Sequence, residues 1–63
     1  MTNLQRERKK RGFTQEELAK LSDVPVSTLR KYEQEKLDIN KTTVDVVKRL
    51  AKALKCKVDD IIE

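Results

Sequence analysis

The side chains best suited to chemistry share one face of a short predicted helix, over about residues 26–34. At roughly 100° per residue, Leu29 and Tyr32 fall on one side of this helix and turn inward. The opposite side presents a hydroxyl, a cation and an amide: Ser27, Lys31 and Gln34. Such groups suit contact with base edges and phosphates. Any surface helix also turns polar groups outward, so this face alone leaves DNA binding and a plain solvated surface equally open.

The groups that catalysis and metal binding require are missing. The chain has no histidine and a single cysteine, Cys56, which rules out an intramolecular disulfide and argues against a clustered zinc site. Gly12 is the only glycine, so there is no glycine loop to cradle a phosphate, and no nucleophile has a base near it. We therefore expect no enzymatic activity, no metal, no cofactor and no small-molecule ligand, and a reduced Cys56 that packs in the fold.

The composition is that of one small, basic domain. The 63 residues are 37% hydrophobic and 41% charged, with a net charge of +4 and a pI near 9.4. This charge favours an anionic partner. The length is near the lower limit for folding without disulfides or metals, so residues 1–63 are expected to form a single domain. Since no apolar run reaches the length of a signal peptide core or a membrane span, we expect a cytoplasmic protein without membrane contact.

Capping residues and a proline set the helices around the polar face. Thr14 and Glu17 have the Thr-x-x-Glu spacing of a capping box, which starts a helix. This helix carries apolar residues at helical spacing: Leu18, Ala19 and Leu21. Pro25 disfavours the helical conformation at the residue before it, so the helix must end near residues 22–24. A second helix then begins beside Pro25, where a missing N–H costs little.

Two more helices are predicted outside this pair. The first, about Thr2 to Arg11, is almost entirely polar, with Leu4 as its apolar contact. The last, about Thr42 to Leu54, has an apolar stripe: Val44, Val47, Leu50, Ala51 and Leu54. Its opposite face carries lysines that we expect to be solvated: Lys41, Lys48, Lys52 and Lys55. A final helical turn is predicted over about Val58 to Ile62.

The linker over residues 36–41 precedes that last long helix. Leu37 and Ile39 are expected to turn inward and to keep the linker ordered. Asn40 or Thr42 is expected to cap the helix that follows, because both side chains can accept a hydrogen bond from a backbone N–H at a helix start.

One set of residues, spread over nearly the whole chain, matches a known pattern. It comprises Leu4, Arg8, Gly12, Thr14-Gln15-x-Glu17-Leu18-Ala19, Val24, Ser27-Thr28-Leu29, Tyr32-Glu33 and Leu50-Ala51-x-Ala53-Leu54. On these residues the chain resembles the phage Cro/repressor family of helix-turn-helix proteins, also called XRE-type. The resemblance implies an all-α, compact five-helix DNA-binding domain in which the second and third helices form the helix-turn-helix.

Matched residue by residue, the resemblance also implies a binding site. Base contacts fall at the start of the third helix and one turn further on: Val26, Ser27 and Lys31. Phosphate contacts fall on four residues: Gln15, Thr28, Arg30 and Lys36. Arg8 and Glu33 are implied to form a buried ion pair that ties the first helix to the third, so that loss of either partner would leave the other charge stranded.

The function implied is sequence-specific binding of double-stranded DNA by a transcriptional repressor or regulator. Such domains usually act as homodimers on palindromic operators, and Ile61 and Ile62 are the candidate dimer surface, as an apolar pair at the chain's end. An alternative of another class stays open: a protein-interaction module or antitoxin of the same fold, with DNA binding secondary or lost. A steep salt dependence of affinity for duplex DNA would separate the two.

Three residues depart from the family pattern: Glu7, Asp23 and Glu35. Glu7 stands where an aliphatic residue is common, and the other two stand where glycine is usual. We expect Asp23 to tolerate the left-handed backbone that glycine would adopt. Glutamate tolerates it poorly, so Glu35 is expected to lie in an extended third helix or in a reshaped loop.

Overall fold

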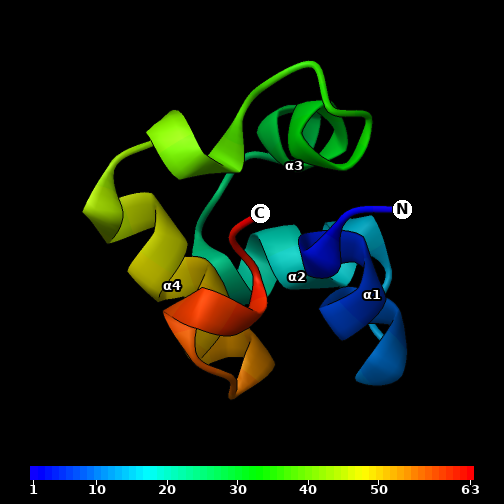
Figure 1. Ribbon diagram of the computed structural model, residues 1–63. Coiled ribbons are helices and arrows are strands. Elements are labelled where there is room, and N and C mark those ends of the chain that lie inside the picture. Colours follow the sequence, from blue (N-terminus) through cyan, green and yellow to red (C-terminus); the bar gives the residue numbers. More distant parts are fainter.

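Helices account for all the regular structure in the computed structural model, which describes residues 1–63 (Figure 1). Their order is α1 (Asn3–Lys10), α2 (Gln15–Ser22), α3 (Val26–Glu33), η1 (Ile39–Lys41), α4 (Val44–Leu54) and η2 (Val58–Asp60), where η marks a 3-10 helix. The all-α class is confirmed, but the count of five α-helices is not. The fifth is the 3-10 turn η2, in which the N–H groups of Asp60 and Ile61 bond to carbonyl groups three positions back, at 3.0 and 3.1 Å.

Threonine caps start three of the four α-helices. Thr2 Oγ1 accepts from Gln5 N–H, and Thr14 Oγ1 accepts from Glu17 N–H while Glu17 bonds back to Thr14 N–H. The capping box is therefore confirmed. The expected cap of α4 is wrong, because Thr43 fills that place instead. An additional turn, η1, precedes α4, and the neighbouring Thr42 hydroxyl is occupied by Tyr32 Oη at 2.6 Å.

All four α-helices end in the same kind of turn. Each is closed by a residue with positive φ: Gly12 at 76°, Asp23 at 57°, Glu35 at 62° and Lys55 at 54°. In each case the next residue's N–H bonds to the carbonyl five positions back: Phe13 to Arg8, Val24 to Ala19, Lys36 to Lys31 and Cys56 to Ala51. This is the hydrogen bond of a Schellman turn, which normally places glycine at the left-handed position. Only the turn that ends α1 has a glycine, Gly12, at this position.

Glu35 therefore differs from its expected conformation. It neither extends α3 nor reshapes the turn, and it adopts the left-handed backbone despite its side chain. The physical reason is the pair of bonds around it, Lys36 N–H to Lys31 O at 2.8 Å and Glu35 N–H to Tyr32 O at 3.1 Å. Together they satisfy carbonyl groups that would otherwise be left free at the end of α3.

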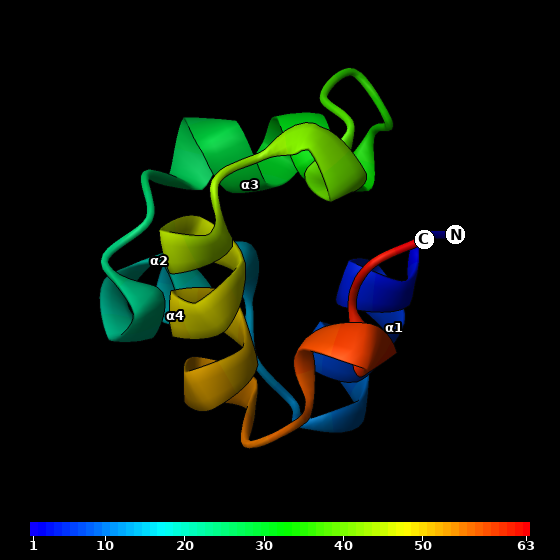
Figure 2. The ribbon, with the colours of Figure 1, turned by 60° about the vertical axis from the view of Figure 1, so that its left-hand side comes forward.

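The core is formed where the helices meet. Helix α2 packs against α3 and α4, while α1 packs against α3 and η2. Figure 2 shows η2 beside α1. Six side chains are fully buried: Leu4, Leu18, Leu29, Leu50, Leu54 and Ile61. Two residues of the predicted stripes are not part of this core, since Leu21 is 59% exposed and Val44 is 67% exposed. Leu18 and Ser22 occupy the inner face of α2, which turns Leu21 outward, and Val44 lies at the first residue of α4, at the edge of the packed region.

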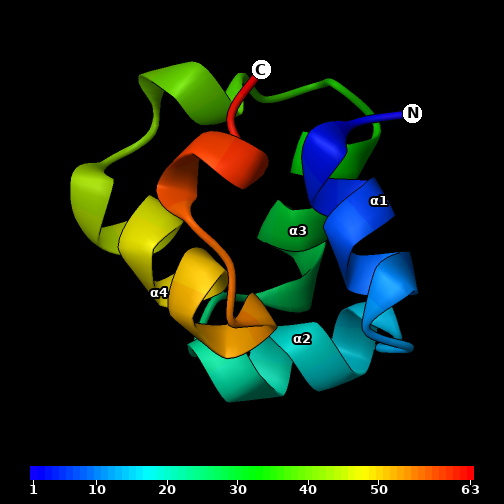
Figure 3. The same cartoon turned by 60° about the horizontal axis from the view of Figure 1, so that its bottom comes forward.

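The two ends of the chain meet beside the loop that follows α3 (Figure 3). Asn3 donates hydrogen bonds to Ile62 O and to the Glu63 carboxylate, both at 2.8 Å. Asn40 exchanges two hydrogen bonds of 2.8 Å with the backbone of Glu63. In the loop itself Ile39 is buried as expected, whereas Leu37 is 42% exposed, contrary to expectation.

Ile61 is fully buried and Ile62 is half-buried. Ile61 is therefore not available as part of the candidate dimer surface, because it is buried in the core, beside η2. This turn packs against α4 and α1 (Figure 3). Separately, the longest helix has 11 residues, and none combines the length and apolarity that a bilayer span requires.

Candidate nucleic-acid interface

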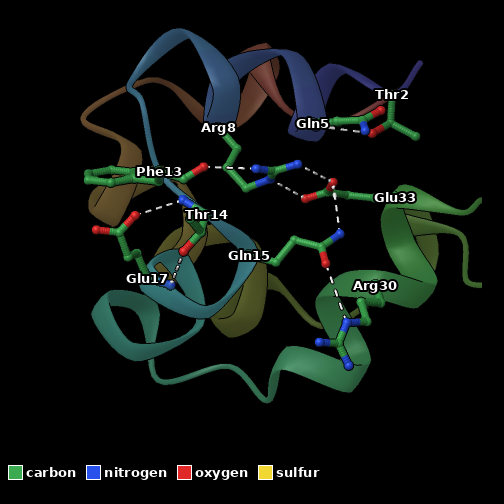
Figure 4. A network of polar contacts seen from close by, with 9 residues as sticks. All are labelled: Thr2, Gln5, Arg8, Phe13, Thr14, Gln15, Glu17, Arg30 and Glu33. Carbon is green, nitrogen blue, oxygen red and sulfur yellow. Dashed lines mark hydrogen bonds and ion pairs between the residues drawn. The ribbon is translucent and has the colours of Figure 1, made fainter.

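A bidentate ion pair joins α1 to α3 beneath the surface. Arg8 Nε lies 2.8 Å from Glu33 Oε2, and Arg8 Nη2 lies 2.9 Å from Glu33 Oε1 (Figure 4). The remaining guanidinium nitrogen, Nη1, donates to Phe13 O at 2.8 Å. The hydrogen bond to Glu33 raises the pKa of Arg8, against the opposing effect of burial. The two residues are 25 positions apart in the sequence, and the structure brings them into contact, as the family pattern implied.

From this ion pair a chain of contacts leads to the surface. Glu33 Oε1 also accepts a hydrogen bond from Gln15 Nε2 at 3.2 Å, and Gln15 Oε1 accepts one from Arg30 Nε at 3.4 Å (Figure 4). Arg30 Nη2 reaches the carboxylate of Glu16, also at 3.4 Å. Gln15 is the first residue of α2, at the positive end of that helix. Its hydrogen bonds to Glu33 and Arg30 hold its amide in a defined orientation there.

The outward face of α3 is free of internal partners. Ser27, Lys31 and Gln34 are exposed, and Val26 and Thr28 are half-buried. The structure contains no side-chain hydrogen bond or ion pair for any of the polar residues of this face, whereas the inward face is fixed by the burial of Leu29 and by the bond from Tyr32 to Thr42. Figure 2 shows α3 along the upper edge of the molecule.

Three of the residues with implied phosphate contacts differ in the partners that their side chains already have. Gln15 and Arg30 are hydrogen-bonded to each other, as part of the chain that starts at Glu33. Lys36 is exposed and its backbone is bonded to Lys31 O, so the turn at the end of α3 fixes its place relative to the helix. Lys36 has no partner for its ammonium group, whereas Arg30 is already paired with Glu16.

Arg49 is a residue of this region that the sequence reasoning missed. Its Nη1 donates to Asp23 O at 3.1 Å, which ties α4 to the turn between α2 and α3. Its Nε lies 3.3 Å from Asp45 Oδ2, in ionic contact but without hydrogen-bond geometry. The spacing of four between Asp45 and Arg49 was the available signal for a helical ion pair. Nothing local indicated the contact with Asp23.

Two short helices joined by a left-handed turn, with a free polar face on the second, define a helix-turn-helix protein. A family profile described as Helix-turn-helix matches residues 4–61. The chain therefore belongs to the XRE-type helix-turn-helix family, a family of DNA-binding regulators that are typically not enzymes. No curated protein and no solved structure matches the chain. No group of three or more histidine, cysteine, aspartate or glutamate side chains is placed to hold a metal ion.

Proposed function

We propose that this protein binds double-stranded DNA sequence-specifically and acts as a cytoplasmic transcriptional repressor, with α3 inserted into the major groove. The observation that carries the proposal is the contrast between the two faces of α3. Its inward face is buried and bonded, and its outward face has polar side chains without a single internal partner. A helix fixed on one side and unsatisfied on the other is suited to present side chains to base edges.

Base reading is assigned to three residues of α3. Lys31 is exposed and unpaired, and its ammonium suits the O6 and N7 acceptors of guanine. Val26, at the start of the helix, suits the methyl group of thymine, and Ser27 beside it can donate to or accept from either base type.

Phosphate binding is assigned to Gln15, Thr28, Arg30 and Lys36. Gln15 lies at the first position of α2 and Thr28 in the first turn of α3, where backbone N–H groups and the helix dipole favour an anion. Support for Gln15 is strongest, because its amide is already oriented by Glu33. Arg30 would have to share its guanidinium with Glu16, so its contribution is expected to be smaller than that of Lys36.

We further propose that two copies bind a palindromic operator. A twofold dimer would place its two α3 helices one turn of DNA apart, about 34 Å. Since Ile61 is buried, the dimer surface must use other residues.

Selection of bound sequences from a random duplex library, at near-physiological salt, tests the proposal. Recovery of a palindrome with half-sites about one helical turn apart is the expected result. Affinity for the recovered site should then fall steeply with salt, because neutralised phosphates release counterions. If circular dichroism shows that the protein is folded and yet no sequence is enriched, the proposal of sequence-specific DNA binding is wrong. The protein-interaction alternative is then favoured.

A further inference from the structure

A hollow of about 340 Å³ opens between the start of α1, the end of α3 and the loop over residues 35–40. Its volume lies at the lower end of the range of small-molecule sites, roughly 300–1,000 Å³. The apolar part of its lining comes from Leu4, Tyr32, Leu37 and Ile39. Leu37 is the exposed member of this set, at 42%, so apolar surface is available to a ligand there.

The charge of this hollow is opposite to that of the chain. Glu35, Asp38 and Glu63 line it, and no lysine or arginine does, although the net charge of the protein is +4. None of the three carboxylates is in an ion pair. Asp38 and Glu63 each accept one backbone N–H, from Asn40 and Asn3, while the side chain of Glu35 has no hydrogen bond at all.

We propose that this hollow binds a small organic cation with an apolar body, of the aryl-alkyl amine class. The apolar body would lie against Tyr32 and Leu37, and the ammonium group would face the unpaired carboxylate of Glu35. Charge complementarity selects a cation over a neutral or anionic ligand. The volume, and walls contributed by three separate segments, select a small molecule over a protein surface.

This inference is independent of DNA binding, so it is tested on the folded protein without DNA. The probe is phenethylamine. Its binding is measured by NMR, from the backbone and side-chain chemical shifts of the full chain. Two matched compounds separate charge from shape: 2-phenylethanol keeps the shape without the charge, and methylamine keeps the charge without the body. We expect saturable shifts centred on Tyr32, Leu37 and Ile39, with a dissociation constant of about 1 mM.

The neutral analogue should bind at least about threefold more weakly, and methylamine should not saturate. Equal affinity for 2-phenylethanol would overturn the role of the carboxylates. Shifts spread over acidic residues elsewhere, such as Asp59, would show general ion association and would overturn the site itself.

A variant pair localises the charge. Glu35→Gln removes an unpaired carboxylate and should weaken phenethylamine about threefold, whereas Asp59→Asn removes an exposed, unpaired carboxylate outside the hollow and should leave affinity unchanged. Leu37→Ala, at an exposed position, should weaken phenethylamine and 2-phenylethanol alike. If Glu35→Gln and Asp59→Asn have equal effects, the assignment of the ammonium group to Glu35 is wrong.

Discussion

Glu33 holds Gln15. The carboxylate that neutralises Arg8 in the interior also accepts the Gln15 amide at 3.2 Å, so one group fixes α1 on α3 and orients a side chain at the start of α2. The proposed phosphate contact is therefore pre-organised by an interaction made for stability. Mutations of Glu33 will affect both folding and binding, and the two effects have to be measured separately.

Loss of Glu33 should be far more damaging than loss of its exposed neighbour. Glu33→Ala leaves Arg8 buried without its countercharge, so the free energy of unfolding should fall by roughly 3–5 kcal/mol. Glu35→Ala removes an exposed, unpaired side chain and should change it by less than about 0.5 kcal/mol. Urea denaturation of both variants provides the comparison, and equal midpoints would mean that the ion pair does not support the fold.

The contribution of Arg8 should not depend on pH in the neutral range. Its pKa is raised in the folded state, so the stability it contributes is fully present below the ordinary arginine pKa. It is lost only as the pH rises through the still higher folded value. The difference in stability between the native protein and the double variant Arg8→Met/Glu33→Gln, which leaves no unpaired buried charge, should accordingly stay constant from pH 7 to pH 9 in thermal denaturation.

Lys31 should control specificity. Lys31→Ala is expected to lower affinity for the selected site by roughly 1–3 kcal/mol and to relax the preference at one base pair. Lys48→Ala is the matched control, an exposed lysine on the outer face of α4. Competition assays against every single-base variant of the site give the answer. A uniform loss over all sequences would instead identify Lys31 as a phosphate contact.

Gln15 and Lys36 should be distinguishable by salt. Both are assigned to phosphates, but only Lys36 is charged. Lys36→Ala should reduce the slope of log K against log salt by about 1, while Gln15→Ala should lower affinity and leave the slope unchanged. Binding isotherms at several salt concentrations measure both quantities, and a changed slope for Gln15→Ala would contradict a direct, uncharged contact.

Glycine at position 35 should stabilise the protein. Glu35 adopts the left-handed backbone at a cost of roughly 1–2 kcal/mol that glycine does not incur, so Glu35→Gly should raise the free energy of unfolding by about 1 kcal/mol. Gly12→Ala is the reciprocal experiment. A Cβ at Gly12 would meet no atom within 4 Å, so the expected loss of about 1 kcal/mol is conformational alone. Destabilisation by Glu35→Gly would mean that the glutamate side chain itself supports the turn.

Helix boundaries were the part of the fold most open to prediction from sequence. Thr14 with Glu17, and then Pro25, placed the ends of α2 and the start of α3 correctly, because caps and proline act on backbone groups within a few residues. Helical periodicity likewise separated Leu29 from Ser27. Each of these signals is local, and each agrees with the structure.

The features that were predicted wrongly or missed depend on packing between segments far apart in the sequence. Val44 and Leu21 have helical spacing to the core residues, yet Val44 lies at the edge of the packed region and Leu21 lies on the outer face of α2. Ile61 was a candidate for the dimer surface, but it is fully buried in the core, beside a turn that packs against α1, a segment far away in sequence. In the candidate site, the link from Gln15 to Glu33 joins residues 18 positions apart and has no local signature. The assignments of residues to bases and phosphates remain predictions.

The hydrogen bonds from Asn3 to Ile62 and Glu63 have a consequence for folding during synthesis. Helix α1 leaves the ribosome well before one of its packing partners, η2, and before the groups of Ile62 and Glu63 that bond Asn3. Helices α2 and α3 pack against each other across a short turn, so this pair can assemble before η2 has been made. Contacts of α1 with α3 can form earlier, but those with η2, Ile62 and Glu63 must wait until these segments are made, so they form at a late step of co-translational folding.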